Sequence, residues 1–153
     1  MERCELAYRY HQEGFNCAQS VVGAFLDRLS LTKEQAMAAC CGFGGGVGGS
    51  REELCGAGSG GVMVLSLLNP HTDGGDKEGK QRTYALAAEF RRRFADAFGG
   101  LTRCGALLEA SPVANKKTAA ATRMGLTAFC DIAIVTAVEI VEELLAEQAQ
   151  EQA

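Results

Sequence analysis

Cysteine is the residue type in this sequence that is best placed to do chemistry. The chain of 153 residues contains seven cysteines, at Cys4, Cys17, Cys40, Cys41, Cys55, Cys104 and Cys130. An odd number cannot all pair within one chain, so the open interpretations are redox-active thiols, ligands of a metal or cluster, and small core residues. The sequence has no CxxC and no CxxCH, which argues against thioredoxin-like chemistry and zinc-ribbon spacing and excludes covalently attached haem.

Three of these cysteines lie near predicted starts of helices. Asn16 and Gln19 have the spacing of a capping box, which predicts that Cys17 is the first residue of a helix. Cys55 and Cys104 each follow a further capping signature within a few residues. The start of a helix carries positive partial charge and unpaired N–H groups, and both favour thiolate over thiol. We therefore predict that the pKa of these three thiols is lowered.

The other four cysteines carry weaker signals. Cys130 is predicted in the middle of the last helix, on its apolar face, where by itself it is interpreted as a core residue. Cys40 and Cys41 form a vicinal pair at the end of a predicted helix, which suits a strained disulfide, a soft ligand pair or simple packing. Cys4 lies on the first predicted helix and indicates nothing.

Two glycine-rich segments surround Cys55. Residues 42–49 read GFGGGVGG, which cannot be helical without a large entropic cost. Residues 55–61 read CGAGSGG, where small residues spaced by four let another helix or a cofactor approach the backbone closely. A phosphate-binding loop would need a Gly-Lys-Ser or Gly-Lys-Thr sequence, and a dinucleotide fingerprint would need a preceding strand. Neither is found. The glycines are therefore expected to leave space beside a reactive sulfur or a cluster, or to allow close packing of helices. The glycines proposed to contact a cofactor are Gly44, Gly45, Gly56 and Gly60.

Composition narrows the classes of partner and compartment. Hydrophobic residues make up 47% of the chain, which is typical of a globular protein. The net charge is −4 and no basic stripe occurs, so nucleic acid is not an expected partner. No apolar run reaches membrane-spanning length and no signal peptide opens the chain, so a cytoplasmic protein without a membrane span is expected. His11 and His71 stand alone as predicted surface residues, and Arg91-Arg92-Arg93 as a solvated helix face.

The elements that must position the cysteines are predicted to be helices throughout. The predicted helical segments are 2–13, 17–29, 32–41, 50–68, 80–98, 103–109 and 118–148. The predicted fold class is all-α, a compact bundle of five to seven helices with the glycine-rich loop between the third and fourth. We expect one domain over 1–153, with 146–153 frayed.

The order of these motifs resembles the C-GCAxxG-C-C family. The similar stretches are GFNCAQSV at 14–21, FGGG at 43–46, CGAxxG at 55–60, the Arg/Phe-rich helix and glycine break that lead into CGALL at 104–108, and Cys130 with the apolar residues 134–140. The resemblance spans roughly residues 7–145. It implies that Cys17, Cys55, Cys104 and Cys130 are the site residues, and it leaves Cys4, Cys40 and Cys41 outside the motif.

The resemblance also implies redox work, because some relatives carry selenocysteine and related modules occur beside electron-transfer cofactors. One hypothesis is a thiol redox protein in which Cys17 and Cys55 cycle between dithiol and disulfide with a redox partner protein or a small thiol. A second is an electron-transfer or structural module in which all four cysteines bind an iron–sulfur cluster or zinc. A third is a helical interaction protein whose cysteines merely pack. One group of four sulfurs would favour the second hypothesis, and a bonded pair with two remote thiols would favour the first.

Overall fold

The computed structural model of the chain describes residues 2–114 and 118–153, with the backbone alone for 111–114. Within these ranges the secondary structure is eight α-helices and two short 3-10 helices, with no strand. The α-helices are α1 (Arg3–Gln12), α2 (Cys17–Gly23), α3 (Lys33–Cys40), α4 (Gly56–Leu68), α5 (Lys77–Ala97), α6 (Cys104–Ala114), α7 (Ala119–Arg123) and α8 (Phe129–Glu151), and the 3-10 helices are η1 (Leu26–Arg28) and η2 (Cys41–Phe43). The all-α class is confirmed, with one α-helix more than the predicted five to seven.

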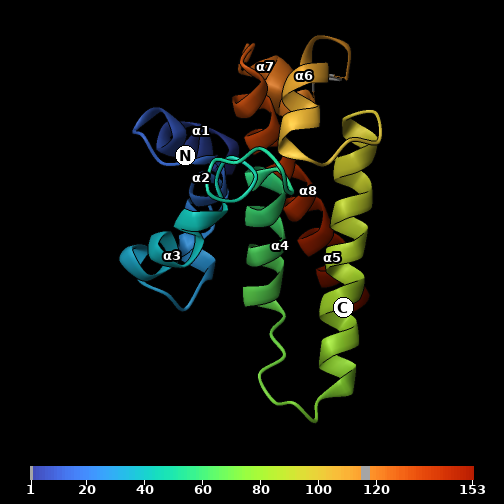
Figure 1. Ribbon diagram of the computed structural model, residues 1–153. Helices are drawn as coiled ribbons and strands as arrows, with labels where there is room; N and C mark the ends of the chain where they lie inside the picture. Colours follow the sequence, from blue (N-terminus) through green and yellow to red (C-terminus); the bar gives the residue numbers. More distant parts are fainter. Residues whose placement is uncertain (1, 115–117) are drawn as a thin grey trace.

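Three helices, α4, α5 and α8, pack against one another along the long direction of the molecule (Figure 1). The short helices α1, α2 and α3 lie on one side of them, where α2 packs against α4 and α1 packs against α8. α6 and α7 lie at the end where α4 begins (Figure 1). This arrangement brings the starts of several helices to one end of the fold.

The core contains a row of phenylalanine rings along α5. Phe90, Phe94 and Phe98 have successive ring centroids 5.8 Å and 4.9 Å apart, and Phe129 at the start of α8 continues the row at 5.4 Å. On α4, Gly61 makes room for this row, because a Cβ there would overlap the ring of Phe90. Burial of each phenylalanine contributes roughly 1.5–3 kcal/mol. The row therefore fastens α4 and α8 to α5.

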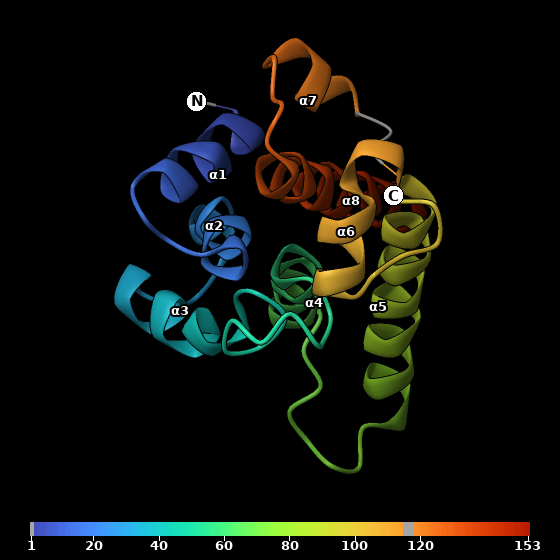
Figure 2. The same cartoon turned by 45° about the horizontal axis from the view of Figure 1, so that its top comes forward.

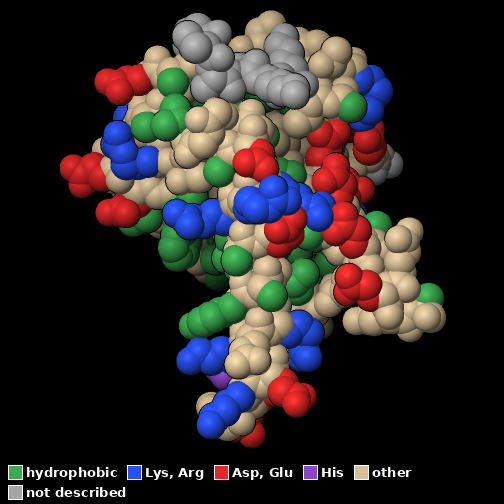
Figure 3. All heavy atoms as spheres, turned by 90° about the vertical axis from the view of Figure 1, so that its right-hand side faces the viewer, with side chains coloured by type: hydrophobic (Ala, Val, Ile, Leu, Met, Phe, Trp, Pro, Cys, Tyr) green, Lys and Arg blue, Asp and Glu red, His purple; other side chains and the backbone are tan. Residues whose placement is uncertain are grey.

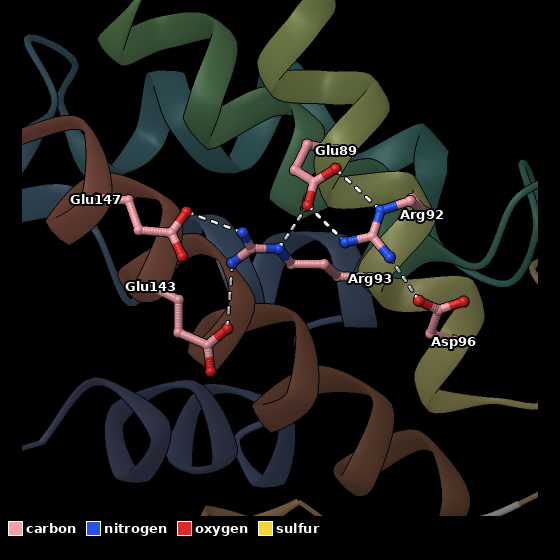
Figure 4. A network of polar contacts seen from close by, with 6 residues as sticks. All are labelled: Glu89, Arg92, Arg93, Asp96, Glu143 and Glu147. Atoms are coloured by element: carbon pink, nitrogen blue, oxygen red, sulfur yellow. Dashed lines mark hydrogen bonds and ion pairs between the residues drawn. The ribbon is translucent and has the colours of Figure 1, made fainter. Parts of the chain in front are cut away.

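A polar network reinforces the contact between α5 and α8 (Figure 4). The guanidinium of Arg93 donates to Glu89 on its own helix at 2.9 Å and to Glu147 on α8 at 2.8 Å, and it lies 3.5 Å from Glu143. Arg93 is partly buried and bridges two helices, so the predicted solvated face at 91–93 is wrong for this residue. Exposed ion pairs contribute at most about 1 kcal/mol each, so the aromatic row outweighs this network.

Charged side chains of both signs are mixed over the face of the molecule that α5 presents (Figure 3). Within the described ranges, no helix is both long and apolar enough to cross a membrane.

The helix boundaries agree with the sequence where the caps are local. The capping boxes Asn16/Gln19 and Thr32/Gln35 are both formed, as predicted. Ser50 does not cap a helix, because its hydroxyl donates to the carbonyl of Gly46 at 2.7 Å within the glycine loop, and α4 begins only at Gly56.

Two long predicted helices are shorter than expected. The predicted helix 17–29 ends at Gly23 and is followed by the 3-10 turn η1. The predicted helix 118–148 is two helices, α7 and α8, because the chain turns at Gly125, which has a φ of 65°. α8 is helical to Glu151, through most of the segment 146–153 that is predicted to fray.

Candidate functional site

One cavity brings together the cysteines singled out from the sequence. It has a volume of about 280 Å³, and its wall includes Cys17, Cys55, Cys104 and Cys130. The rest of the wall is glycine and apolar side chains with a single charged residue: Gly45, Gly49, Arg51, Leu108, Phe129 and Ala133. Four cysteines that are up to 113 residues apart in the chain, from 17 to 130, therefore face a common space.

Each of the four cysteines lies at the start of a different helix. Cys17 is the first residue of α2, Cys55 is the N-cap of α4, and Cys104 is the first residue of α6. Cys130 is the second residue of α8, so its predicted position in the middle of a helix is wrong. Because the chain turns at Gly125, the helix restarts beside Cys130, and this cysteine is exposed rather than buried in the core.

The position of Cys17 is set by a local cap. The side-chain oxygen of Asn16 accepts from the N–H of Gln19 at 3.0 Å, and the side-chain oxygen of Gln19 accepts from the N–H of Asn16 at 3.1 Å. The amide of Asn16 also donates to the carbonyl of Cys41 at 2.8 Å, which ties the start of α2 to the end of α3. Gly44 packs against this amide, because a Cβ there would lie 2.5 Å from the side chain of Asn16.

The positions of Cys55 and Cys104 depend on each other. The N–H of Cys55 donates to the carbonyl of Thr102 at 2.9 Å, and the N–H of Cys104 donates to the carbonyl of Glu53 at 2.9 Å. Together with the antiparallel bridge between Leu54 and Arg103, these bonds hold two distant chain segments side by side. Sequence reasoning missed this pairing, since neither segment has the alternating pattern of a strand.

The four glycines predicted to contact a cofactor have different roles. Gly45 is part of the cavity wall. Gly44 makes room for Asn16, and Gly56 lies directly against the sulfur of Cys17. Gly60 lets α4 approach the backbone of α2, because a Cβ there would lie 2.8 Å from the carbonyl oxygen of Ala18. Close packing therefore explains three of the four, and the glycine loop lies beside the starts of α4 and α6 (Figure 2).

The predicted lowering of the cysteine pKa values is wrong for the thiols at which a shift is resolved. The pKa of Cys55 is raised to about 12, mainly by burial and then by the neighbouring Cys17, although the N–H groups of Ala57 and Gly58 act in the opposite direction. Burial, followed by Cys17, also raises the pKa of Cys104. The cost of removing a thiolate from water thus outweighs the favourable helix terminus.

At Cys130, too, desolvation outweighs the effect of the helix start on the pKa of the thiol. Although Cys130 is exposed as a residue, desolvation of its thiol by the surrounding protein is the largest cause of its raised pKa. Cys17, Cys104 and Asp131 add to this shift, while Arg51 lowers the pKa. Several thiolates in this one cavity would repel each other. A positively charged group among them would favour their ionised form.

The spread of the donors distinguishes between kinds of metal site. A single zinc ion requires its thiolate sulfurs to converge at about 2.3 Å from one point. Among the residues that the structure describes, no three His, Cys, Asp or Glu side chains are gathered to hold one metal ion. The four cysteines line the wall of the cavity instead of converging on one point.

The remaining cysteines lie outside the cavity wall. Cys4 is buried, its thiol donates to the carbonyl of Val135 at 3.7 Å, and burial raises its pKa to about 12. Cys40 is buried against the carbonyl of Ala36 at 3.1 Å, whereas Cys41 is exposed. All seven cysteines, each within the described ranges, are free thiols.

A side-chain hydrogen bond beside Cys130 was not anticipated. His11, predicted as a surface residue, is partly buried, and its Nδ1 lies 2.6 Å from a carboxylate oxygen of the buried Asp131. Gln12 donates to the same oxygen at 3.4 Å. The acidic residue that directly follows Cys130 was the available sequence signal, but its distance from His11 along the chain concealed the contact.

The fold and the cavity define an all-helical protein with four thiols from four helices around one space. Residues 15–144 match the family described as "Putative redox-active protein (C_GCAxxG_C_C)", and the chain belongs to this family. The comparison finds no matching curated protein and no matching solved structure.

Proposed function

We propose that this protein is an electron-transfer module in which Cys17, Cys55, Cys104 and Cys130 together bind an iron–sulfur cluster. The observation that carries the proposal is that all four cysteines line one cavity. Four thiolates are the usual ligand set of such clusters, and a bound cluster would supply one-electron transfer. A dithiol–disulfide cycle would employ two of the four and leave the other two without a role.

The cavity itself supports a group larger than a single ion. Its volume is about 280 Å³, and its wall includes Gly45 and Gly49, which carry no side chain. Leu108, Phe129 and Ala133 give the rest of the wall an apolar character. An apolar surrounding limits solvent access, which is one of the ways in which a protein tunes a redox centre.

A specific contact favours a second candidate, a redox-active pair formed by Cys17 and Cys55. The sulfur of Cys17 lies against Gly56, the residue next to Cys55, and Cys17 is the largest charged influence on the pKa of Cys55 after burial. In this cycle one thiolate attacks the disulfide of a partner protein or small molecule, and the second displaces the partner as a dithiol. The two cysteines lose two electrons and two protons, and the partner disulfide gains them.

The test is the content of the protein purified without oxygen. We expect visible absorption together with iron and acid-labile sulfide, and we expect Cys→Ser changes at each of the four positions to lower the iron content strongly. Cys41→Ser is the matched control, because Cys41 is exposed and lies outside the cavity wall. The Cys41→Ser protein should therefore retain its iron.

Protein that carries no iron or sulfide, even after chemical reconstitution, would overturn the cluster. In that case a gain of two thiols on reduction, abolished by Cys17→Ser or Cys55→Ser but kept in Cys104→Ser, would establish the second candidate.

A further inference from the structure

Arg51 is the one charged residue among those that line the cysteine cavity. It also lines a neighbouring pocket of about 380 Å³ beside Arg103 and Glu109. The two hollows share Arg51 and Leu108, so Arg51 lies in the wall between the cysteines and the outer surface.

The backbone holds Arg51 in an unfavourable conformation. Its φ is 65°, in the left-handed region, which among non-glycine residues of the described ranges is shared only with Val47. Its N–H donates to the carbonyl of Gly45 at 2.8 Å, and its carbonyl accepts from the N–H of Gly105 at 2.7 Å. Residues kept in such conformations by several surrounding contacts are concentrated at functional sites.

Two glycines provide the space for this backbone. A Cβ on Gly46 would lie 3.0 Å from the Cα of Arg51, and a Cβ on Gly105 would lie 2.8 Å from its carbonyl oxygen. The surrounding loop is therefore built to keep Arg51 at this point of the wall.

The guanidinium of Arg51 differs from those of several other arginines in its contacts. Arg3, Arg92, Arg93 and Arg123 each form an ion pair with an acidic side chain. Within the described ranges, the guanidinium of Arg51 forms no ion pair and donates no hydrogen bond to a protein group. Its charge remains available to the cavity.

We propose that Arg51 is the counter-charge of the cysteine cavity and raises the reduction potential of the redox centre held there. This inference rests on the proposed function, because it requires a redox centre in the cavity. When a one-electron reductant reduces that centre, the centre gains one negative charge. A fixed positive charge stabilises the reduced state more than the oxidised state. Because Arg51 is exposed, solvent screens part of this attraction and the expected shift is correspondingly modest.

The experiment is an anaerobic potentiometric titration of the full chain carrying its centre. Arg51→Gln removes the charge, and we expect its reduction potential to shift to a more negative value. Arg51→Lys keeps the charge and should stay closer to wild type. Arg91→Gln is the matched control, because Arg91 is an exposed arginine on α5 outside the cavity wall. The reduction potential of the Arg91→Gln protein should equal that of wild type.

A fourth variant separates charge from folding. Arg51→Gly removes the charge and also relieves the left-handed backbone, so it should shift the potential as Arg51→Gln does without loss of fold stability. A wild-type potential in Arg51→Gln or Arg51→Gly would overturn the inference and leave the proposed function intact. A wild-type protein without any titratable centre would overturn both.

Discussion

The sulfur of Cys17 lies against Gly56 so closely that a Cβ on residue 56 would overlap it. Cys17 begins α2 and Gly56 begins α4, so this contact joins the starts of two helices that pack along their length. The absence of a side chain at Gly56 therefore allows the sulfur of Cys17 to take its position in the cavity wall.

The first prediction concerns this contact. Gly56→Ala should displace the sulfur of Cys17, lower the retained iron or the thiol redox activity, and reduce the free energy of unfolding by about 1–3 kcal/mol, as overpacking does. Gly58→Ala on the same helix is the control. Its added Cβ would lie 3.3 Å from the end of the Leu54 side chain, which can move, so the redox centre should be unchanged. Equal loss of the centre in both variants would contradict the role of Gly56.

The second prediction concerns Val47 in the glycine loop. Val47 has a φ of 67° and is exposed, so its side chain gains little from burial while its backbone is strained. Val47→Gly should relieve about 1–2 kcal/mol of strain and lose about 0.4–1 kcal/mol to the flexibility of the unfolded chain. We expect chemical denaturation to show a net gain in stability. Val47→Ala keeps the Cβ and should gain clearly less; equal gains would show that the backbone at 47 is not strained.

The third prediction concerns the pair of His11 and Asp131. His11→Ala removes the nearest polar partner of a buried carboxylate, which should cost about 1–3 kcal/mol in the free energy of unfolding. His71→Ala is the comparison, because the Nε2 of His71 is buried without a hydrogen-bond partner among the described residues. It should cost less. A larger loss for His71→Ala in thermal or urea unfolding would refute the importance of the contact between His11 and Asp131.

The fourth prediction concerns stability in alkaline solution. Burial raises the pKa of Cys4 from 9.0 to about 12 and that of Cys40 to about 11. In the unfolded chain these thiols ionise near pH 9, whereas in the folded chain they stay protonated, so their contribution to stability is present below pH 9. That contribution is lost as the pH rises from 9 toward 12.

The free energy of unfolding should therefore fall over this range, and less steeply in Cys4→Ala. Cys41→Ala, which removes an exposed thiol, should keep the slope of wild type. An unchanged slope in Cys4→Ala would contradict the burial of this thiol.

Much of the fold was predictable because helix signals are local. The capping boxes at Asn16 and Thr32 involve groups within three residues, so their sequence pattern and their structure coincide. Ser50 carries the same signature, yet its hydroxyl bonds to Gly46 and α4 starts later. At Ser50 a hydrogen bond within the glycine loop takes the place of the cap. The four residues of the capping pattern give no information about the loop, so they do not predict this outcome.

The sequence by itself determined an all-helical chain and, through Cys17, Cys55 and Cys104, three cysteines near helix starts. Only the tertiary structure decided that Cys130 also begins a helix and that the four cysteines meet at one cavity. Only it decided that burial raises the pKa of Cys55, which a helix start alone would lower. The reason is the range of the forces: capping acts within one turn, whereas desolvation and the meeting of sulfurs depend on packing between segments far apart in the chain.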